Sequence, residues 1–553
     1  MTRLCSRTLG AALALCLLHG ATGAGQTTRP GQRPLGPIPA ELLERPVPLR
    51  EGIGFAHEAA TTTSDRAHAY CDQGLAYLHS YVWIEAARSF NQALRIDRNL
   101  AMAYLGLSYA LGELGASEGA REASQRASAL AGTVTEREQA RIAVRSKQLA
   151  ASAQPDNPTL RAEYERELDR AVVRHPDDVE LLLLRGHADD GAHDSHGMGG
   201  GNGSIRFYER ALALRPDYFP THHYLAHAYE NVGQMDRALD HAGVYARAAP
   251  AVPHAHHMHG HVLRRVDRMN EAIAEFRRAD ELEMAYFKSE NIPPEYDWHY
   301  HHNLDLLGTA YEYVGQMRSA EPILRRSFDL RSIELSQELN EKAWPMFLLA
   351  RGRADEALAA SRALVGRSAP LVQALGHLLT SRVLMALHRM DDATEEGDAG
   401  LRQMRASGAV GGVLVPELQL TQGELLLRTG QAERGRAMFL DALAKVRAER
   451  GPDAWIQALF SLEAAGRIAR EAGGPELAAG LAEQMRQYDS SYAGTHYALG
   501  LAAEQRGDFA SARAEYGEAV RRWASADASL PDLADAKRRL AAMETAGGHR
   551  DPR

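Results

Sequence analysis

The sequence has little cysteine and no apolar run long enough to cross a membrane. Only three of its 553 residues are cysteine, so disulfides contribute little to its stability. The formal net charge of −9 argues against nucleic acid as a partner, because the phosphate backbone is itself anionic. The sequence also lacks an HExxH pair, a Gly-x-Ser-x-Gly elbow and a phosphate-cradling glycine loop. These absences disfavour the common hydrolase and nucleotide-binding classes.

The N-terminus has the pattern of a secretory signal peptide, residues 1–24. Two arginines precede an apolar stretch at 9–18, and small residues follow it. This stretch is too short for a membrane span, so we expect cleavage and a periplasmic or secreted location. A lipoprotein signal at Cys16 is disfavoured because Leu15 stands where a small residue is wanted. The mature chain would keep one cysteine, Cys71, and therefore no internal disulfide.

The rest of the chain divides by composition and periodicity into four parts. Residues 25–65 are rich in Pro, Gly and Thr and predict a mostly extended leader. Helical repeats follow in an N-terminal array at 66–340 and a C-terminal array at 341–546, which ends in a polar capping helix. Residues 547–553 are expected to form a disordered tail.

The clearest repeat is "FPTHHYLAHAYENVGQMDRALDHAGVYARAAP", residues 219–250. Its small and bulky residues fall where a tetratricopeptide repeat (TPR) places its helix contacts. We therefore predict an all-α fold, a right-handed superhelical TPR solenoid of antiparallel helix pairs. Such arrays commonly bind a protein or peptide in their concave groove. The residues that match the pattern in this repeat are Leu225, Ala226, Tyr229, Gly233, Ala238, Ala242, Tyr245 and Pro250.

Histidine is concentrated in one part of the chain, since twelve of the 24 histidines lie between residues 222 and 302. In a TPR unit the second, fifth, ninth and twelfth places of the first helix face the groove. Three successive first helices place histidines or carboxylates at these positions. The predicted groove residues are His223, His227, His254, His257, His261, His302 and Asp305, with Glu230 and Glu312 as further carboxylates.

The spacing of these histidines suits metal chelation. His223 and His227 are four residues apart, as are His257 and His261, so each pair shares one helix face. Sites rich in imidazole and free of thiolate suit Cu, Zn, Ni or Fe. We predict a transition-metal site in the groove, with Cu, Zn or Fe as the ion.

Other interpretations of the histidines remain open. His222, His256 and His259 fall at packing places and are expected to be core or edge residues. His299 and His301 lie at a helix entry and fit either role. A histidine-lined groove without metal would be a polar peptide-binding surface, or one that responds to pH near 6.5.

A glycine-rich insertion, "DDGAHDSHGMGGGNGS", interrupts the repeat upstream of the histidine-rich helices. It carries His193 and His196, and His187 precedes it at or near a groove-facing place. A long loop inside a compact repeat is usually functional or disordered. The insertion is therefore either a lid over the groove with additional ligands or a solvated linker.

Several stretches resemble motifs of a group of bacterial TPR proteins, which carry "HYYIHAVE", "GHLVHMPSHIY" and "PHNLHFL". Here the counterparts are "HYLAHAYE", "PHAHHMHGHVL" and "HHNLDLLG". The resemblance covers about a third of the chain and implies no settled activity. It departs at Asp305, where the group has a further histidine, and at His259 and Gly260, which replace Pro-Ser. It places on the group's histidine positions His223, His227, His254, His257, His261 and His302.

Three classes of function fit these observations. The first is an exported TPR protein with a transition-metal site, used for metal handling or for metal-dependent, including oxidative, chemistry. The second is a periplasmic scaffold that binds a protein or peptide without metal or catalysis. The third is a hydrolase with a zinc-bound water and Glu230 or Glu312 as base, for which no motif is present. The sequence leaves open whether the protein is an enzyme.

Overall fold

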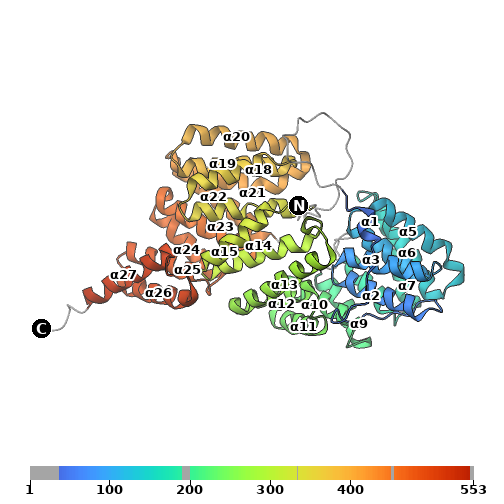
Figure 1. Cartoon of the computed structure of the whole chain (residues 1–553). Helices are drawn as coiled ribbons and strands as arrows, with labels where there is room; N and C mark the ends of the chain where they lie inside the picture. Colours follow the sequence, from blue (N-terminus) through green and yellow to red (C-terminus); the bar gives the residue numbers. More distant parts are fainter. Residues whose placement is uncertain (1–36, 190–199, 333, 450–453, 548–553) are drawn as a thin grey trace, which may run out of the picture. The chain divides into compact units, whose positions relative to one another are not determined.

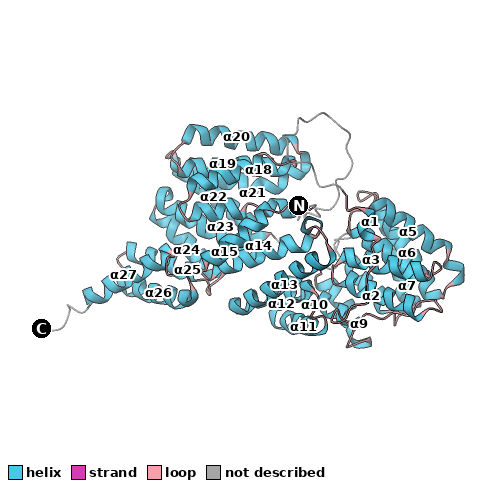
Figure 2. Cartoon of the chain, viewed as in Figure 1, coloured by secondary structure: helices cyan, strands magenta, loops and turns pink. Residues whose placement is uncertain are grey.

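The structure is a computed structural model, and its described residues fold almost entirely into α-helices (Figure 2). Within this described part there is no β-strand, which confirms the predicted all-α class. The predicted signal peptide and the insertion histidines His193 and His196 lie outside the described residues. The structure describes residues 37–189, 200–332, 334–449 and 454–547.

The described chain forms two compact units. The N-terminal unit comprises Leu35–Ala310 and Leu330–Ile333, and consecutive helices pack there as hairpins, α2 with α3 through to α12 with α13 (Figure 1). Its helices are α1 (Ala40–Leu43), α2 (Asp65–His79), α3 (Trp83–Ile96), α4 (Ala101–Glu113), α5 (Ser117–Ala129), α6 (Glu136–Ser152), α7 (Pro158–Arg174), α8 (Val179–Asp189), α9 (Asn202–Leu214), α10 (Phe219–Asn231), α11 (Met235–Ala248), α12 (Pro253–Leu263), α13 (Met269–Glu290) and most of α14 (Trp298–Tyr313).

The C-terminal unit begins inside α14, at Tyr311, and continues the helical hairpins, for example α19 with α20 and α21 with α22. Its boundary thus lies some thirty residues before the predicted start of a second array at residue 341. The remaining helices are α15 (Met317–Asp329), α16 (Leu335–Asn340), α17 (Ala343–Ala350), α18 (Ala354–Val365), α19 (Pro370–Ala386), α20 (Met390–Ala406), α21 (Val415–Arg428), α22 (Ala432–Ala448), α23 (Ala454–Ile468), α24 (Pro475–Tyr488), α25 (Ala493–Gln505), α26 (Phe509–Arg522) and α27 (Pro531–Gly547).

Small residues allow the helices of neighbouring hairpins to approach closely. Gly74 on α2 and Gly106 on α4 both face the ring of Phe90 on α3. A Cβ atom at Gly106 would lie 2.2 Å from that ring, and one at Gly74 would lie 2.7 Å from it. Since real Cβ atoms do not approach so closely, glycine is required at both positions for the three helices to pack around this aromatic residue.

Residues 37–65, the described part of the leader predicted as extended, are largely non-helical but contain the short helix α1. They also pack on the repeats, because Val47 and Ile53 are buried and the amide of Ala251 donates to the Gly52 carbonyl at 2.8 Å. Gly54 has φ +84° and lies against the ring of Phe219, where a Cβ would be 2.6 Å away. This described part of the leader therefore contributes to the core of the N-terminal unit and lies beside the starts of α10 and α12.

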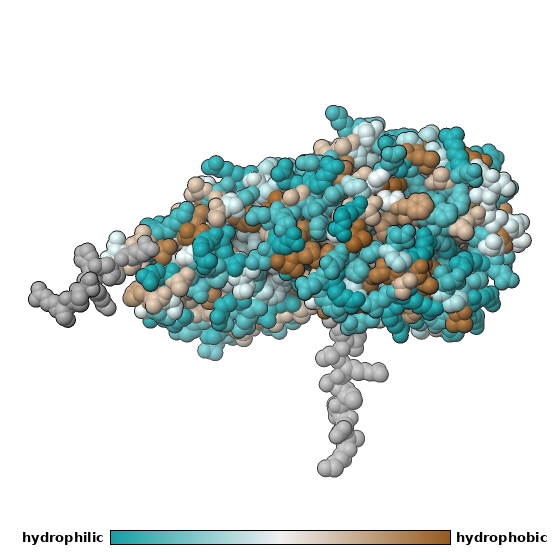
Figure 3. Space-filling model, turned by 90° about the horizontal axis from the view of Figure 1, so that it is seen from below, coloured by the Kyte–Doolittle hydropathy of each residue, from teal (hydrophilic) through white to brown (hydrophobic). Residues whose placement is uncertain are grey.

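The described helices include none that is long and apolar enough to span a membrane. The face drawn in Figure 3 intersperses hydrophilic with apolar residues, and most of the surface in view is hydrophilic.

Candidate metal centre

The six predicted groove histidines come from α10, α12 and α14, the helices that begin three successive repeats. Pro220 and Pro253 stand in the first turns of α10 and α12, where a missing backbone N–H costs nothing. The helical period then directs residues three and four apart to one face. All six side chains are buried, with 0% to 8% of each residue exposed. They form a buried centre rather than the lining of an open groove.

Three of the six, His223, His227 and His254, form the first triad, with ligand atoms within 4.8 Å of one another. Nδ1 of His223 lies 2.7 Å from the backbone oxygen of His79, which can only accept a hydrogen bond. The proton of His223 is therefore on Nδ1, and Nε2 carries a lone pair. That Nε2 lies 2.9 Å from Nε2 of His254, and Nε2 of His227 is buried without a hydrogen-bond partner. The first triad thus presents imidazole nitrogens to one point.

The other three, His257, His261 and His302, form the second triad, again with ligand atoms within 4.8 Å. Nδ1 of His261 donates to both carboxylate oxygens of Glu230, at 2.8 and 2.9 Å. Nδ1 of His257 donates to Oδ1 of Asn303 at 3.1 Å. Outer partners of this kind set the tautomer and orientation of metal-binding histidines. They leave Nε2 of both rings unprotonated.

Asn303 and Arg264 fix further details of the second triad. The amide nitrogen of Asn303 donates to the carbonyl of Phe276 at 3.0 Å, so its oxygen faces His257. Nη2 of Arg264 lies 3.3 Å from Nε2 of His261 and donates to it. An ion bound at this nitrogen would replace that hydrogen bond.

The two triads are adjacent. The rings of His254 and His257, one from each triad, lie 5.6 Å apart and nearly parallel. His299 stands between them, with its ring 4.8 Å from His254 and 4.5 Å from His257. Nδ1 of His299 lies 2.5 Å from Oε1 of the buried Glu283. His299, which the sequence leaves undecided, therefore belongs to the histidine cluster.

Aromatic side chains cover the centre. The ring of Tyr81 lies 4.6 Å from His223 and 4.8 Å from His254, and Trp298 stacks on His302 at 6.1 Å. Tyr81 has φ +58° and stands in the turn between the two helices of its repeat, where Gly115, Gly233 and His388 of other repeats also have a positive φ. Sequence reasoning missed Tyr81, because neither its backbone angle nor its contacts with a distant repeat have a sequence signature.

Burial keeps the imidazoles in their neutral form. It lowers the pKa of His227 to about 3 and holds the pKa values of His223, His254 and His257 well below the ordinary value. Neutral imidazole is the form that binds metal ions. Burial raises the pKa of Glu230, but the neighbouring His261 and Arg264 outweigh it and lower the value to about 2.

The other residues predicted for the site have different positions. Asp305 joins neither triad, and its Oδ2 lies 3.6 Å from Nδ1 of His301. Glu230 contacts His261 and so supports a ligand from outside the triad. Glu312 is in the C-terminal unit and pairs with Arg351 at 2.9 Å.

The three histidines expected at packing places do pack away from both triads. Nδ1 of His222 lies 2.9 Å from Nδ1 of His241 on α11. His256 and His259 both contact Glu275 on α13, at 2.6 and 2.8 Å. Each therefore faces the second helix of its own repeat, as expected from its place in the first.

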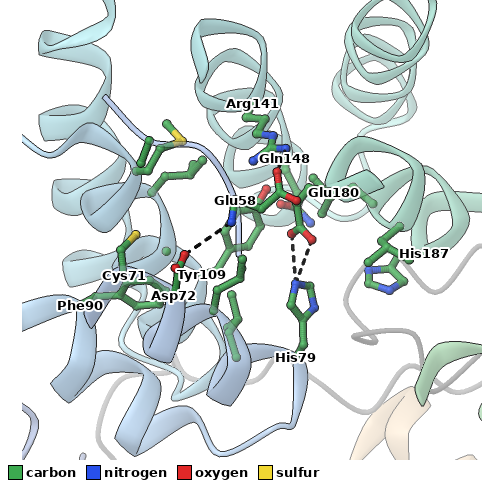
Figure 4. A pocket seen from close by; sticks show the side chains of 18 of the residues that line it. Glu58, Cys71, Asp72, His79, Phe90, Tyr109, Arg141, Gln148, Glu180 and His187 are labelled. Carbon is green, nitrogen blue, oxygen red and sulfur yellow. Dashed lines mark hydrogen bonds and ion pairs between the residues drawn. The ribbon is translucent and has the colours of Figure 1, made fainter. Parts of the chain in front are cut away.

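A pocket of about 110 Å³ is lined in part by His79, Glu180 and His187 (Figure 4). It adjoins the first triad because the backbone oxygen of His79 contacts His223. Nδ1 of His79 lies 2.7 Å from the Tyr224 hydroxyl and Nε2 lies 3.0 Å from Glu180. Burial raises the pKa of Glu180, but His79 and Arg141 lower it to about 2. This pairing holds the turn whose carbonyl orients His223. The predicted additional ligand His187 lines this pocket and not the triads, with its ring edge-on to Tyr224 at 4.5 Å.

Comparison with known proteins identifies the repeat. A profile described as Tetratricopeptide repeat matches residues 207–240, and no curated protein matches the chain. Yeast Tom70 is 12% identical with a TM-score of 0.33, over 88% of this chain and 97% of that one. A tetratricopeptide repeat protein from Parabacteroides merdae is 14% identical with a TM-score of 0.35, over 51% of this chain and 99% of that one. The matched repeat and the helical hairpins make the fold an all-α tetratricopeptide-repeat solenoid.

Proposed function

We propose that this TPR protein binds two transition-metal ions, one in each histidine triad. The observation that carries the proposal is the division of the six sequence-predicted histidines into two groups of three, each with its ligand atoms within 4.8 Å. The His79 carbonyl, Asn303 and Glu230 support it, because each orients an imidazole from outside.

The donor set favours a metal that accepts nitrogen ligands. Imidazole suits Cu, Zn, Ni and Fe, and copper has the highest affinity for such donors in the first-row series. Three protein ligands per ion leave coordination positions open for a further molecule, as in catalytic rather than structural sites. The centre therefore suits metal handling or metal-dependent chemistry, including oxidative chemistry.

The chain's own residues have distinct roles in this proposal. The six triad histidines bind the metal, while the rings of Tyr81 and Trp298 pack against His254 and His302 and hold them in place. Arg264 supplies a hydrogen bond to Nε2 of His261 in the absence of an ion. We also propose export to the periplasm or beyond, which the arginines and apolar stretch of residues 1–24 support.

Metal analysis tests the proposal directly. The mature chain, purified without a histidine tag, should carry two ions per molecule after incubation with Cu²⁺ and desalting. His223→Ala and His257→Ala should each lose one of the two ions, because they remove a ligand from different triads. His256→Ala is the matched control, since it removes an α12 histidine that contacts Glu275 instead. Binding of no Cu, Zn, Ni or Fe above background would refute the metal centre.

A protein- or peptide-binding role is the second candidate, and the C-terminal unit favours it. The histidine and carboxylate clusters found among the described residues all lie in the N-terminal unit. The C-terminal unit repeats the helical hairpins without them, and TPR surfaces commonly bind protein or peptide. The zinc hydrolase is not supported, because Glu230 is engaged by His261 and Glu312 by Arg351.

A further inference from the structure

A chamber of about 370 Å³ in the N-terminal unit reaches the histidine cluster from one side. Its volume is in the range of pockets that hold small organic molecules. His254 of the first triad and His299 form part of its wall, so a molecule in the chamber would contact the proposed metal centre. The rest of the lining includes three tyrosines and four carboxylates, namely Tyr77, Tyr81, Tyr286, Glu51, Glu85, Glu283 and Asp297.

Most charged groups at this chamber already have a partner of opposite charge or a hydrogen-bonded histidine. Glu85 pairs with the buried Arg88 and accepts from the Tyr286 hydroxyl at 3.0 Å. Glu283 is engaged by His299, and Arg50 pairs with Glu290. These groups leave no excess positive charge in the chamber.

Asp297 differs from these carboxylates. Its Oδ1 accepts from the backbone amides of His299 and Tyr300 at 2.9 and 3.2 Å, at the start of α14. Among the described residues no lysine, arginine or histidine forms an ion pair with it. Asp297 is half-buried and caps α14, so the helix N-terminus stabilises its charge in part. It thus presents to the chamber a carboxylate that has no cationic side chain as a partner.

We propose that the chamber binds a small organic ammonium ion, with its cationic nitrogen at Asp297 and its apolar body against the tyrosine rings. Aromatic faces attract an organic cation, and the carboxylate supplies the opposite charge. The molecule would lie beside His254 and is the substrate class of the metal centre, so this inference rests on the proposed function. Anions are disfavoured by Asp297, Glu85 and Glu283.

A metal ion is the competing occupant at this end of the chamber. Glu283, Asp297 and His299 have ligand atoms within 4.8 Å of one another. Glu283 and His299, however, are hydrogen-bonded to each other at 2.5 Å, a contact that an ion among the three would break. The organic cation leaves that contact intact and needs only Asp297.

Calorimetric titration of the full mature chain tests the proposal with benzylamine, benzyl alcohol and benzoate at pH 7. These probes share one ring and differ in charge. The protein should bind benzylammonium at least tenfold more tightly than benzyl alcohol and should not bind benzoate. Asp297→Asn keeps a side-chain acceptor for the helix start and should reduce the ammonium affinity to that of the alcohol. Glu281→Gln, which removes the same charge from the exposed face of α13, should change nothing.

A second variant separates loss of binding from loss of folding. Ala285 lines the chamber but is exposed, so Ala285→Trp should block the chamber and abolish amine binding without lowering the melting temperature. Equal affinity for the ammonium and the alcohol, or unchanged binding in both variants, would overturn the inference. Mn²⁺ or Zn²⁺ bound in an Asp297-dependent way without amine binding would assign the chamber to a metal instead.

Metal content measured on the same samples distinguishes the two proposals. Two bound ions without amine binding would remove only the ammonium inference. Amine binding that depends on Asp297 in a protein that binds no metal would remove the metal centre and leave an amine-binding chamber.

Discussion

Replacing Asn303 with leucine should weaken metal binding at one triad only. Asn303 is fully buried and has three hydrogen bonds. It accepts from Nδ1 of His257 and donates to the carbonyl of Phe276 and, at 3.4 Å, to Oε2 of Glu283. Leucine has a similar volume but can neither donate nor accept a hydrogen bond, so the ring of His257 loses the contact that sets its tautomer. The first triad does not contact Asn303 and should keep its affinity.

The size of the effect follows from the role of such outer partners. Their loss typically lowers metal affinity by about 10- to 100-fold, which corresponds to about 1.4–2.7 kcal/mol. The apoprotein should also be destabilised by about 1–3 kcal/mol, because the Phe276 carbonyl loses its donor in a buried setting. The loss of affinity and the loss of stability therefore have separate causes and are measured separately.

Competition with a chelator of known affinity resolves the two ions and gives a dissociation constant for each. Urea unfolding of the metal-free protein gives the change in stability. Thr380→Val is the matched control, since it removes a buried hydrogen bond to Ser361 in the C-terminal unit and should lower stability without changing either affinity. Equal weakening of both ions by Asn303→Leu, or a change below threefold, would refute the assignment of Asn303 to one triad.

Four further outcomes are expected. His222→Ala should lower stability by about 1–3 kcal/mol through its lost contact and keep both ions, and lost metal would contradict its packing role. Chelation should lower the melting temperature of the native protein, because an ion at 100 times its dissociation constant adds about 2.7 kcal/mol to the free energy of unfolding. It should hardly change the melting temperature of a His223→Ala, His257→Ala double variant. Burial lowers the pKa of His241 in the folded protein to about 4. As the pH falls, the unfolded chain therefore protonates this histidine before the folded protein does, and the free energy of unfolding should decrease between pH 6.5 and about 4. In urea titrations, His241→Phe should reduce this decrease. Gly54→Ala should destabilise the N-terminal unit by about 1–3 kcal/mol, because φ is positive and the Phe219 ring blocks a Cβ; an unchanged urea midpoint would show that the leader is not docked.

The outer partners of the histidines show where sequence reasoning stopped. Glu230 could be selected from its place on α10, although its role as a partner of His261 rather than a ligand required the structure. Asn303 and the His79 carbonyl had no signal in the sequence, because a backbone oxygen or a buried amide becomes functional only through what faces it. Glu312, predicted as a further carboxylate, pairs with Arg351, and its helix passes from one unit to the other at Tyr311, which the helical period does not reveal.

The helical class, the TPR pattern and the direction of each histidine on its own helix could all be predicted from the sequence. These features depend on local periodicity, because a period of 3.6 residues places His223 with His227 and His257 with His261 on one face. The packing of the repeats, by contrast, is what makes His254 join the α10 pair and His302 the α12 pair, places His299 between them, and brings Tyr81 against the centre. These contacts join residues up to more than 200 positions apart, as with Tyr81 and Trp298, and depend on how whole repeats pack. A local pattern carries no information on that packing.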